Sequence, residues 1–330
     1  MKKICILGAG TFGVSLATIL HEAGHDVCLW SALPAEIEAL ARTHSHPNLP
    51  GLRLASEVTL TADPAVACAE ADVVLFAVPS PFVRSTAEKV KPFLSRGVLI
   101  ADVAKGIEAD TLLTMSEVIL SVLGNTFPVV ALTGPTHAEE VALSMPTTIV
   151  ASSYDPEAAE TIQSIFDGTC IRAYTNPDPK GSELCGALKN IIALAAGISD
   201  GIGYGDNAKA ALITRGMAEI TRLGIAMGCD TRTFYGLAGI GDLIVTATSP
   251  HSRNGKAGRL IGGGATVSEA LAQVGMVVEG VNALPAAMAL SRQYGVELPI
   301  IRAVHTVVEE GADPLACVRA LMTRTKKSEF

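Results

Sequence analysis

Aromatic residues are scarce in this sequence, and only one tryptophan is present. Phe, Trp and Tyr make up 4% of the 330 residues while 49% are hydrophobic, so Ala, Val, Leu and Ile must fill the interior. No stretch approaches the ~18 apolar residues that a membrane span needs. The formal net charge of -8 argues against a general nucleic-acid or membrane-surface binder. We therefore expect a compact protein without nucleic-acid partners, in which a local basic pocket for an anion is still possible.

Metal-binding and disulfide patterns are also absent. The seven cysteines are scattered, with no C-x-x-C motif and no His-rich spacing, which favours reduced thiols in a cytoplasmic protein and no metal site. The start, "MKKICILGAG", faintly resembles a signal peptide, because two lysines precede apolar residues. Its apolar run is too short for a signal peptide, however, and it ends in glycines that belong to a G-x-G-x-x-G motif.

What the first half does contain is a regular alternation of short β-rich runs and helical patterns. The runs are nearly continuous in apolar residues, as in a parallel sheet covered on both faces. This repetition predicts an α/β Rossmann-type doubly wound sheet over residues 1–180. The expected strands lie at 3–8, 26–30, 72–79, 97–106 and 127–135, with two more in "TTIVASS" (147–153) and "IRAYT" (171–175).

The pattern changes from about residue 181, where helical periodicity dominates. Glycine-rich joints at 201–205, 236–241 and 262–264 separate the helical stretches. The pattern predicts an all-helical C-terminal domain over residues 181–330, which we expect to bind the substrate. The triple glycine at 262–264 is interpreted as a plain loop rather than a hinge, and residues 324–330 as a solvated tail.

The segment "ILGAGTFG" carries Gly8, Gly10 and Gly13 in G-x-G-x-x-G spacing, between a predicted strand and a predicted helix. In that context Gly8 allows the tight turn, Gly10 lets the backbone approach a pyrophosphate, and Gly13 permits close helix–strand packing. The amides of Thr11 and Phe12 then meet the negative charge. The alternative is a strand–helix turn whose glycines serve packing alone.

The choice between NAD and NADP stays open. An acidic residue after the second strand favours NAD, and a basic one favours NADP, but this chain has Ser31 and Ala32 there. We expect Ser31 to lie at the cofactor. The segment "AVPS" (77–80) either passes the cofactor or is an ordinary turn.

Five further motifs occur in order along the chain. They are "AKGIE" (104–108), "LTGPTHAEEVA" (132–142), "CGALKNIIALAAGISDGIGYGDNAKAALITRG" (185–216), "GLAGIGDLIVTATSPHSRNGKAG" (236–258) and "GMVVEG" (275–280). Together with "GAGTFG" they resemble the bacterial-type NAD(P)-dependent glycerol-3-phosphate dehydrogenases over essentially the whole chain. The resemblance implies hydride transfer between NAD(P)H and dihydroxyacetone phosphate to give sn-glycerol 3-phosphate for phospholipid synthesis, and a homodimer is common among such enzymes.

The resemblance also implies roles for individual residues. The proton-transferring lysine falls on Lys189, and a second lysine, at both substrate and cofactor, falls on Lys105. The remaining substrate positions are Gly134, Thr136, Asp242, Ser252, Arg253 and Asn254, and the remaining cofactor positions are Ala138, Arg253, Val277 and Glu279. Lys189, Lys105 and Asp242 are the expected catalytic residues.

These residue types suit the reaction. A free lysine has a pKa of about 10.4, too high for an efficient base at neutral pH. Burial among apolar neighbours and the charge of Lys105 both lower it, whereas bound phosphate and Asp242 oppose the lowering. We expect Lys189 to point into a cleft between the domains. The alternative is a lysine that reaches solvent along its helix. Arg253 suits bidentate phosphate binding, with Ser252 and Asn254 as neutral donors.

Some features leave alternatives open. Thr133 and His137 depart from the family pattern, and His137 is interpreted as a packing residue rather than a catalytic one. Lys209 is expected on a wet face, with a supporting role possible. A hydroxyacid or 3-hydroxyacyl dehydrogenase of the same architecture is the alternative enzyme. A nucleotide-sensing protein without turnover is the alternative of another class.

Overall fold

The structure is a computed structural model that describes residues 1–326 and 328–329. The chain divides into two compact units, Met1–Glu183 and Leu184–Phe330. The division falls inside helix α8 (Pro179–Ile202), whereas the sequence pattern placed the boundary between residues 180 and 181. Each unit has its own architecture.

The first unit is built on one eight-stranded sheet with the order β3-β2-β1-β4-β5-β6-β7-β8. The six strands from β3 to β6 are parallel, β7 runs antiparallel to β6, and β8 is parallel to β7. The doubly wound fold is thereby confirmed. The strands are β1 (Lys3–Leu7), β2 (Asp26–Trp30), β3 (Thr59–Thr61), β4 (Val73–Phe76), β5 (Leu99–Asp102), β6 (Val129–Thr133), β7 (Thr147–Ser152) and β8 (Ile171–Asn176).

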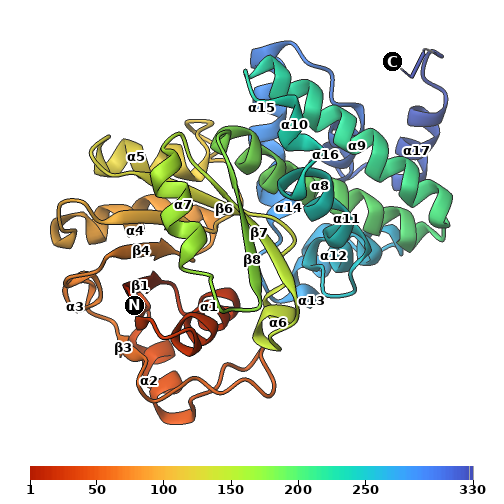
Figure 1. Ribbon diagram of the computed structural model, residues 1–330. Helices are drawn as coiled ribbons and strands as arrows, with labels where there is room; N and C mark the ends of the chain where they lie inside the picture. Colours follow the sequence, from red (N-terminus) through yellow and green to blue (C-terminus); the bar gives the residue numbers. More distant parts are fainter. Residues whose placement is uncertain (327, 330) are drawn as a thin grey trace. The chain divides into compact units, whose positions relative to one another are not determined.

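Helices cover both faces of this sheet, and each face has its own hydrophobic cluster (Figure 1). This double cover explains why the parallel strands are apolar along their whole length. One cluster contains residues of α1 (Thr11–Glu22), α2 (Pro34–Thr43), α6 (Ala138–Ala142) and α7 (Pro156–Ser164). The other contains residues of α3 (Pro64–Cys68), α4 (Val83–Val90) and α5 (Met115–Leu123), and the short 3₁₀ turns Ser80–Phe82 and Lys91–Phe93 flank α4.

The strands β4 (Val73–Phe76) and β6 (Val129–Thr133) are shorter than the expected 72–79 and 127–135, and two other strands differ more. The apolar run at 97–106 predicted a strand through Lys105, but β5 ends at Asp102, so Lys105 lies in the loop beyond the carboxyl end of the sheet. The edge strand β3 was not predicted, because Thr59–Thr61 is short and partly exposed and has no apolar run.

The second unit is helical, as expected. After α8 it contains α9 (Asp206–Ala226), α10 (Thr231–Phe234), α11 (Asp242–Thr248), α12 (Arg253–Gly262), α13 (Val267–Val274), α14 (Glu279–Asn282), α15 (Leu284–Tyr294), α16 (Pro299–Glu309) and α17 (Pro314–Met322). The glycine-rich segment at 236–241 was expected to be a joint. Most of it, Leu237–Gly241, instead forms a π-helical turn that leads directly into α11.

Glycines let α8 and α12 pack backbone against backbone. A Cβ on Gly197 would lie 2.4 Å from the carbonyl oxygen of Gly255, and one on Gly258 would lie 2.3 Å from that of Leu194. Gly262 makes the same kind of approach to Ile198. The first glycine of the 262–264 triplet therefore serves helix packing, and the other two follow the end of α12.

Contrary to the expectation from the sequence, helix α8 is long and apolar enough to cross a bilayer by length and composition alone, but 83% of its apolar window is buried inside the protein. Burial accounts for its composition, because a helix that is hydrophobic all round is typical of a protein core as well as of a membrane span.

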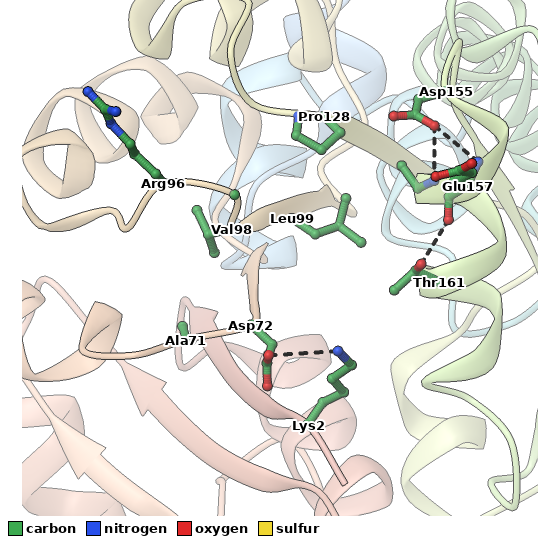
Figure 2. A pocket seen from close by; sticks show the side chains of 12 residues that line it. Lys2, Ala71, Asp72, Arg96, Val98, Leu99, Pro128, Asp155, Glu157 and Thr161 are labelled. Carbon is green, nitrogen blue, oxygen red and sulfur yellow. Dashed lines mark hydrogen bonds and ion pairs between the residues drawn. The ribbon is translucent and has the colours of Figure 1, made fainter.

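A hollow of about 390 Å³ lies at the amino ends of the parallel strands (Figure 2). It is lined by residues just before or at the start of strands, among them Lys2, Asp72, Leu99 and Pro128. Ligands of open α/β sheets bind at the opposite, carboxyl edge. The carboxyl edge is therefore the expected place of a binding site.

Candidate active site

The glycine loop between β1 and α1 has the geometry that dinucleotide binding needs. Gly8 has φ +125°, and a Cβ there would lie 2.6 Å from the carbonyl oxygen of Ala77. A Cβ on Gly13 would lie 1.9 Å from the carbonyl oxygen of Gly8, so α1 packs directly on the turn. A Cβ on Gly10 would meet nothing within 4 Å. The space beside Gly10 is therefore open to a pyrophosphate.

The N-terminus of α1 suits an anion. Helix α1 begins at Thr11 after Gly10, with no side-chain cap and no acidic residue in its first turn. The amides of Thr11 and Phe12 lie in that turn, where the helix dipole favours negative charge. The close approach of Gly8 to Ala77 also brings "AVPS" (77–80) against the glycine loop. This is the position that the segment needs if it passes the cofactor.

Two more residues expected at the cofactor lie next to these elements. Ser31 follows β2, is buried, and donates a hydrogen bond of 2.6 Å to the Glu36 carboxylate. Ala138 is the first residue of α6, and its carbonyl oxygen accepts a 3.0 Å hydrogen bond from the Ser15 hydroxyl on α1. The first turns of α1 and α6 are thus joined.

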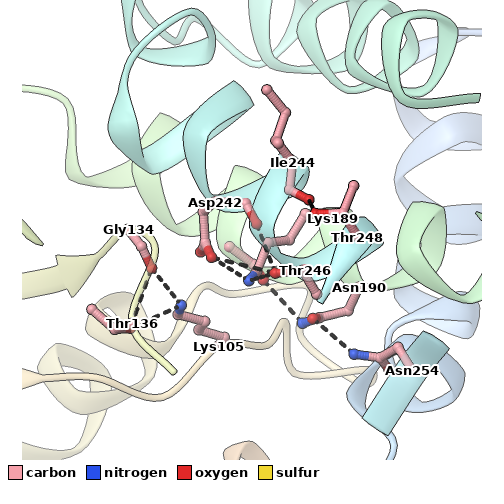
Figure 3. A network of polar contacts seen from close by, with 11 residues as sticks. Lys105, Gly134, Thr136, Lys189, Asn190, Asp242, Ile244, Thr246, Thr248 and Asn254 are labelled. Atoms are coloured by element: carbon pink, nitrogen blue, oxygen red, sulfur yellow. Dashed lines mark hydrogen bonds and ion pairs between the residues drawn. The ribbon is translucent and has the colours of Figure 1, made fainter. Parts of the chain in front are cut away.

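Lys105 lies on the loop after β5, and its ammonium donates to the carbonyl oxygen of Gly134 at 3.0 Å (Figure 3). The same ammonium lies 3.5 Å from the hydroxyl of Thr136, which in turn donates to the Gly134 carbonyl at 3.2 Å. Gly134 itself has φ +119°. The structure therefore brings together the three residues of "AKGIE" and "TGPT" that were expected at the substrate.

Polar contacts on both sides of Lys105 fix its loop. Arg84 of α4 makes a bidentate pair with Glu108, at 2.8 and 2.6 Å, and holds the pKa of that carboxyl below its usual range. The Asp102 carboxylate oxygen Oδ1 accepts from the amide of Ala104 at 3.1 Å. Such contacts pre-organise the lysine between them.

Two buried carboxyl groups lie in the same unit. Burial raises the pKa of Asp102 well above its usual range, and the charge of Glu183 raises it further. Burial also raises the pKa of Glu183 to about 7, although the amide and hydroxyl of Ser116 donate to it at 2.8 and 2.5 Å. Perturbed carboxyl groups of this kind gather at functional sites and in structural networks alike.

Lys189 occupies a fully enclosed position on α8. Its ammonium donates to the Asp242 carboxylate at 2.5 Å and to the Thr246 hydroxyl at 2.6 Å (Figure 3). The relative exposures of Lys189, Asp242 and Thr246 are 4%, 1% and 5%. The alternative of a lysine that reaches solvent along its helix is therefore wrong, and the ammonium is paired where it is buried.

Thr246 was not predicted from the sequence. It lies four residues after Asp242, which places both side chains on one face of α11, and its hydroxyl donates to the Asp242 carbonyl oxygen at 2.6 Å. The π-helical turn before Asp242 sets where this face begins, and such turns are frequent at functional sites. The helical spacing within "GDLIVTAT" was the signal that could have found Thr246.

The start of α12 carries the residues expected at the phosphate. Ser252 is the N-cap, and its hydroxyl accepts from the amide of Gly255 at 3.1 Å. Arg253 is exposed and donates to the carbonyl oxygen of Val277 at 3.0 Å, which joins two of the positions expected at the cofactor. Glu279, which is also expected at the cofactor, is the first residue of α14.

Asn254 is buried and internally bonded. Its amide nitrogen donates to Asn190 at 3.0 Å, and its amide oxygen accepts from the amide of Gly280 at 2.8 Å. Asn190, the neighbour of Lys189, was not assigned a role from the sequence. The pair links α12 to α8 beside the lysine.

The other candidates have structural partners. Lys209 forms an ion pair of 3.0 Å with Asp200. His137 is the N-cap residue of α6, and its carbonyl oxygen accepts from two amides of that helix. Across residues 1–326 and 328–329, no group of three or more His, Cys, Asp or Glu side chains could hold a metal ion.

Comparison with known proteins shows the family of the chain. The family models for the N-terminus and C-terminus of NAD-dependent glycerol-3-phosphate dehydrogenase match residues 3–159 and 178–319. Glycerol-3-phosphate dehydrogenase [NAD(P)+] 2 of Lactobacillus delbrueckii subsp. bulgaricus is 56% identical, over 100% of this chain and 99% of its own length. The corresponding Bacillus subtilis enzyme is 47% identical, over 100% of this chain and 96% of its own. A crystal structure of glycerol-3-phosphate dehydrogenase from Coxiella burnetii has a TM-score of 0.94 at 34% identity, covering 98% and 99% of the two chains. The chain belongs to the NAD(P)-dependent glycerol-3-phosphate dehydrogenase family.

Proposed function

We propose that the chain reduces dihydroxyacetone phosphate to sn-glycerol 3-phosphate with NAD(P)H, and that Lys189 moves the proton. The observation that carries the proposal is the enclosed contact of Lys189 with Asp242 and Thr246, at 2.5 and 2.6 Å, in a chain of this family. A structural lysine has little reason to be buried with one carboxylate, because replacing a buried ion pair with apolar residues is often neutral or stabilising.

The reduction needs a hydride and a proton at one carbonyl group. When bound, NAD(P)H supplies the hydride. Lys189 donates the proton to the carbonyl oxygen, and its charge stabilises the negative charge that develops there. Asp242 and Thr246 fix the position of the ammonium. In the oxidative direction the same amine accepts the proton from the hydroxyl.

The phosphate and the pyrophosphate of the dinucleotide have different main partners, although Arg253 and Lys105 are expected at the cofactor as well as at the substrate. Arg253 offers a planar, permanently charged group for the phosphate dianion, supported by the amides at the start of α12. Lys105, held by Gly134 and Thr136 at 3.0 and 3.5 Å, adds a second cation for the substrate. The dinucleotide pyrophosphate takes the place beside Gly10 and the start of α1.

The test is a substrate panel with purified protein, followed by absorbance at 340 nm with NADH and, separately, NADPH. We expect turnover of dihydroxyacetone phosphate and none of non-phosphorylated hydroxyacid or oxoacid pairs. Turnover of a non-phosphorylated substrate alone would favour the related dehydrogenases of this architecture. Tight dinucleotide binding without any turnover would favour a nucleotide-sensing protein.

We extend the proposal to the setting of the enzyme. The reaction product is a precursor for glycerophospholipids, so the enzyme belongs in the cytoplasm, where its soluble substrate and dinucleotide occur. A homodimer is proposed as the working assembly, and sedimentation of the purified protein tests it.

A further inference from the structure

We propose that Glu36 makes this chain select NADH over NADPH, an inference that rests on the proposed use of a nicotinamide dinucleotide. The family name covers both cofactors, and the residues after β2 carry neither of the usual signals. The structure shows a carboxylate at that place which the linear pattern did not reveal.

The location follows from the sheet. Leu7 of β1 pairs with Trp30 of β2, and the amide of Gly8 donates to the carbonyl oxygen of Trp30 at 2.8 Å. The glycine loop and the residue after β2 are therefore adjacent at the carboxyl edge. In this fold the adenosine ribose lies there, and its 2′ substituent meets the side chains that follow β2.

Ser31 brings Glu36 to this place. The buried Ser31 hydroxyl donates to the Glu36 carboxylate at 2.6 Å, and the same hydroxyl accepts from the amide of Leu33 at 3.1 Å. Glu36 lies in the first turn of α2 and is exposed to solvent. One carboxylate oxygen of Glu36 is thus bonded to Ser31 at the end of β2, while the side chain stays exposed to solvent.

A carboxylate at this position discriminates by charge. It accepts a hydrogen bond from the ribose 2′-hydroxyl of NADH, and it repels the 2′-phosphate of NADPH. A site that accepts the 2′-phosphate needs a cation instead, most often an arginine.

Three basic groups of this region have other surroundings. Arg53 donates to the carbonyl oxygen of Thr43, at the far end of α2. Burial lowers the pKa of His46, although the charge of Glu36 opposes this, and the lowering disfavours its charged form. Lys89 lies over the ring of Trp30, 5.7 Å from its centroid, and Trp30 belongs to the cluster on the opposite face of the sheet from α2.

Dinucleotide binding tests the proposal without turnover. Trp30 is the single tryptophan of the chain and lies at the end of β2, so quenching of its fluorescence reports dissociation constants for NADH and NADPH separately. We expect NADPH to bind at least ~10-fold more weakly than NADH at low ionic strength. Salt should reduce this ratio, because it screens repulsion between exposed charges.

Glu36→Gln removes the charge and keeps an oxygen that can accept from Ser31. It should lower the NADPH dissociation constant at least ~5-fold, change that of NADH less, and abolish the effect of salt on their ratio. Glu38→Gln is the matched control, because Glu38 is an exposed carboxylate on the same helix, and its ratio should equal that of the wild type.

Equal affinity for the two dinucleotides in the wild type would overturn the inference, as would the same ratio in Glu36→Gln and Glu38→Gln. Either result, with dihydroxyacetone phosphate still reduced, leaves the proposed function standing. Failure to bind both dinucleotides would overturn the proposed function as well.

Discussion

The Lys189 ammonium and the Asp242 carboxylate meet at 2.5 Å, although 53 residues separate them and both side chains are buried. Such a contact does not arise from local sequence preference, because α8 must present Lys189 and α11 must present Asp242 and Thr246 at the same buried place. Replacing a buried ion pair with apolar residues of similar volume is often neutral or stabilising, so stability alone does not account for this pair.

Lys189 is the proposed proton donor, and its removal should slow the reaction. Lys189→Ala should lower kcat for dihydroxyacetone phosphate at least ~10²-fold, the low end for general acid–base catalysis. Lys209→Ala is the control, since it breaks the 3.0 Å ion pair with Asp200 in the same unit without touching the proposed proton donor. Steady-state kinetics measure both, with NADH binding checked by fluorescence. Near-normal kcat in Lys189→Ala would remove this residue from proton transfer.

Thr246 and Thr248 offer a matched pair on one helix. The Thr246 hydroxyl accepts from Lys189 and donates to the Asp242 carbonyl oxygen, both at 2.6 Å, whereas the exposed Thr248 hydroxyl donates only to the Ile244 carbonyl oxygen at 2.7 Å (Figure 3). Thr246→Val should lower kcat about 10-fold and lower Tm, because the buried ammonium loses an acceptor. Thr248→Val should change both little. Equal effects of the two substitutions would show that Thr246 only stabilises its helix.

Two glycines of the loop between β1 and α1 allow dinucleotide binding and folding stability to be tested separately. Gly10→Ala should leave Tm nearly unchanged, since its Cβ meets nothing within 4 Å, yet weaken NADH binding at least ~10-fold by filling the place of the pyrophosphate. Gly13→Ala should lower Tm strongly, because its Cβ would lie 1.9 Å from the Gly8 carbonyl oxygen. Thermal unfolding and fluorescence titration measure the two effects. Unimpaired NADH binding by Gly10→Ala would place the dinucleotide elsewhere.

Local patterns in the sequence predicted most of the first unit. The run "DVCLW" matches β2 residue for residue, because a buried parallel strand must be apolar throughout. Strand β5 was predicted too long, since the apolar pattern continues to Val103 and Ala104 after the backbone has left the sheet. Edge strand β3 was missed because partial exposure relaxes the demand for apolar residues.

The resemblance named candidate site residues one by one from motifs, but it did not reveal every contact that the fold makes among them. The contacts of Lys105 with Gly134 and Thr136 span 29 and 31 residues, which the resemblance implied and periodicity alone could not. The Ser31–Glu36 contact was not predicted, because the sequence signal for cofactor choice lies in the residues directly after β2. Glu36 returns to that strand end only once α2 has begun.

We expect Arg253 to bind the substrate phosphate and to contribute little to proton transfer. It is exposed at the start of α12, with one hydrogen bond of 3.0 Å to the Val277 carbonyl oxygen. Arg253→Ala should raise KM for dihydroxyacetone phosphate at least ~10-fold, the loss expected for one charge-assisted hydrogen bond, with a smaller change in kcat. Arg232→Ala, which breaks an exposed pair with Asp230, is the control. An unchanged KM would mean that the phosphate binds to other residues.

The last prediction concerns stability and pH. Glu219 of α9 is 3% exposed, and burial raises its pKa to about 7, even though it accepts from the amides of Ile300 and Ile301 at 2.8 and 3.2 Å. A raised pKa means that the folded state holds the proton more tightly than the unfolded chain does. The stability it contributes is therefore fully present below pH ~4.5 and is lost as pH rises through about 7.

Glu219→Gln should remove this dependence while keeping an oxygen for the amides at the start of α16. The difference in free energy of unfolding between wild type and variant should change by about 3 kcal/mol between pH 4.5 and 8, with the wild type losing stability as pH rises. Urea unfolding at several pH values measures it. Glu297→Gln, at an exposed carboxylate paired with Arg324, should give a nearly constant difference. A constant difference for Glu219→Gln too would mean that Glu219 stays ionised across this range, held by the two amides at the N-terminus of α16.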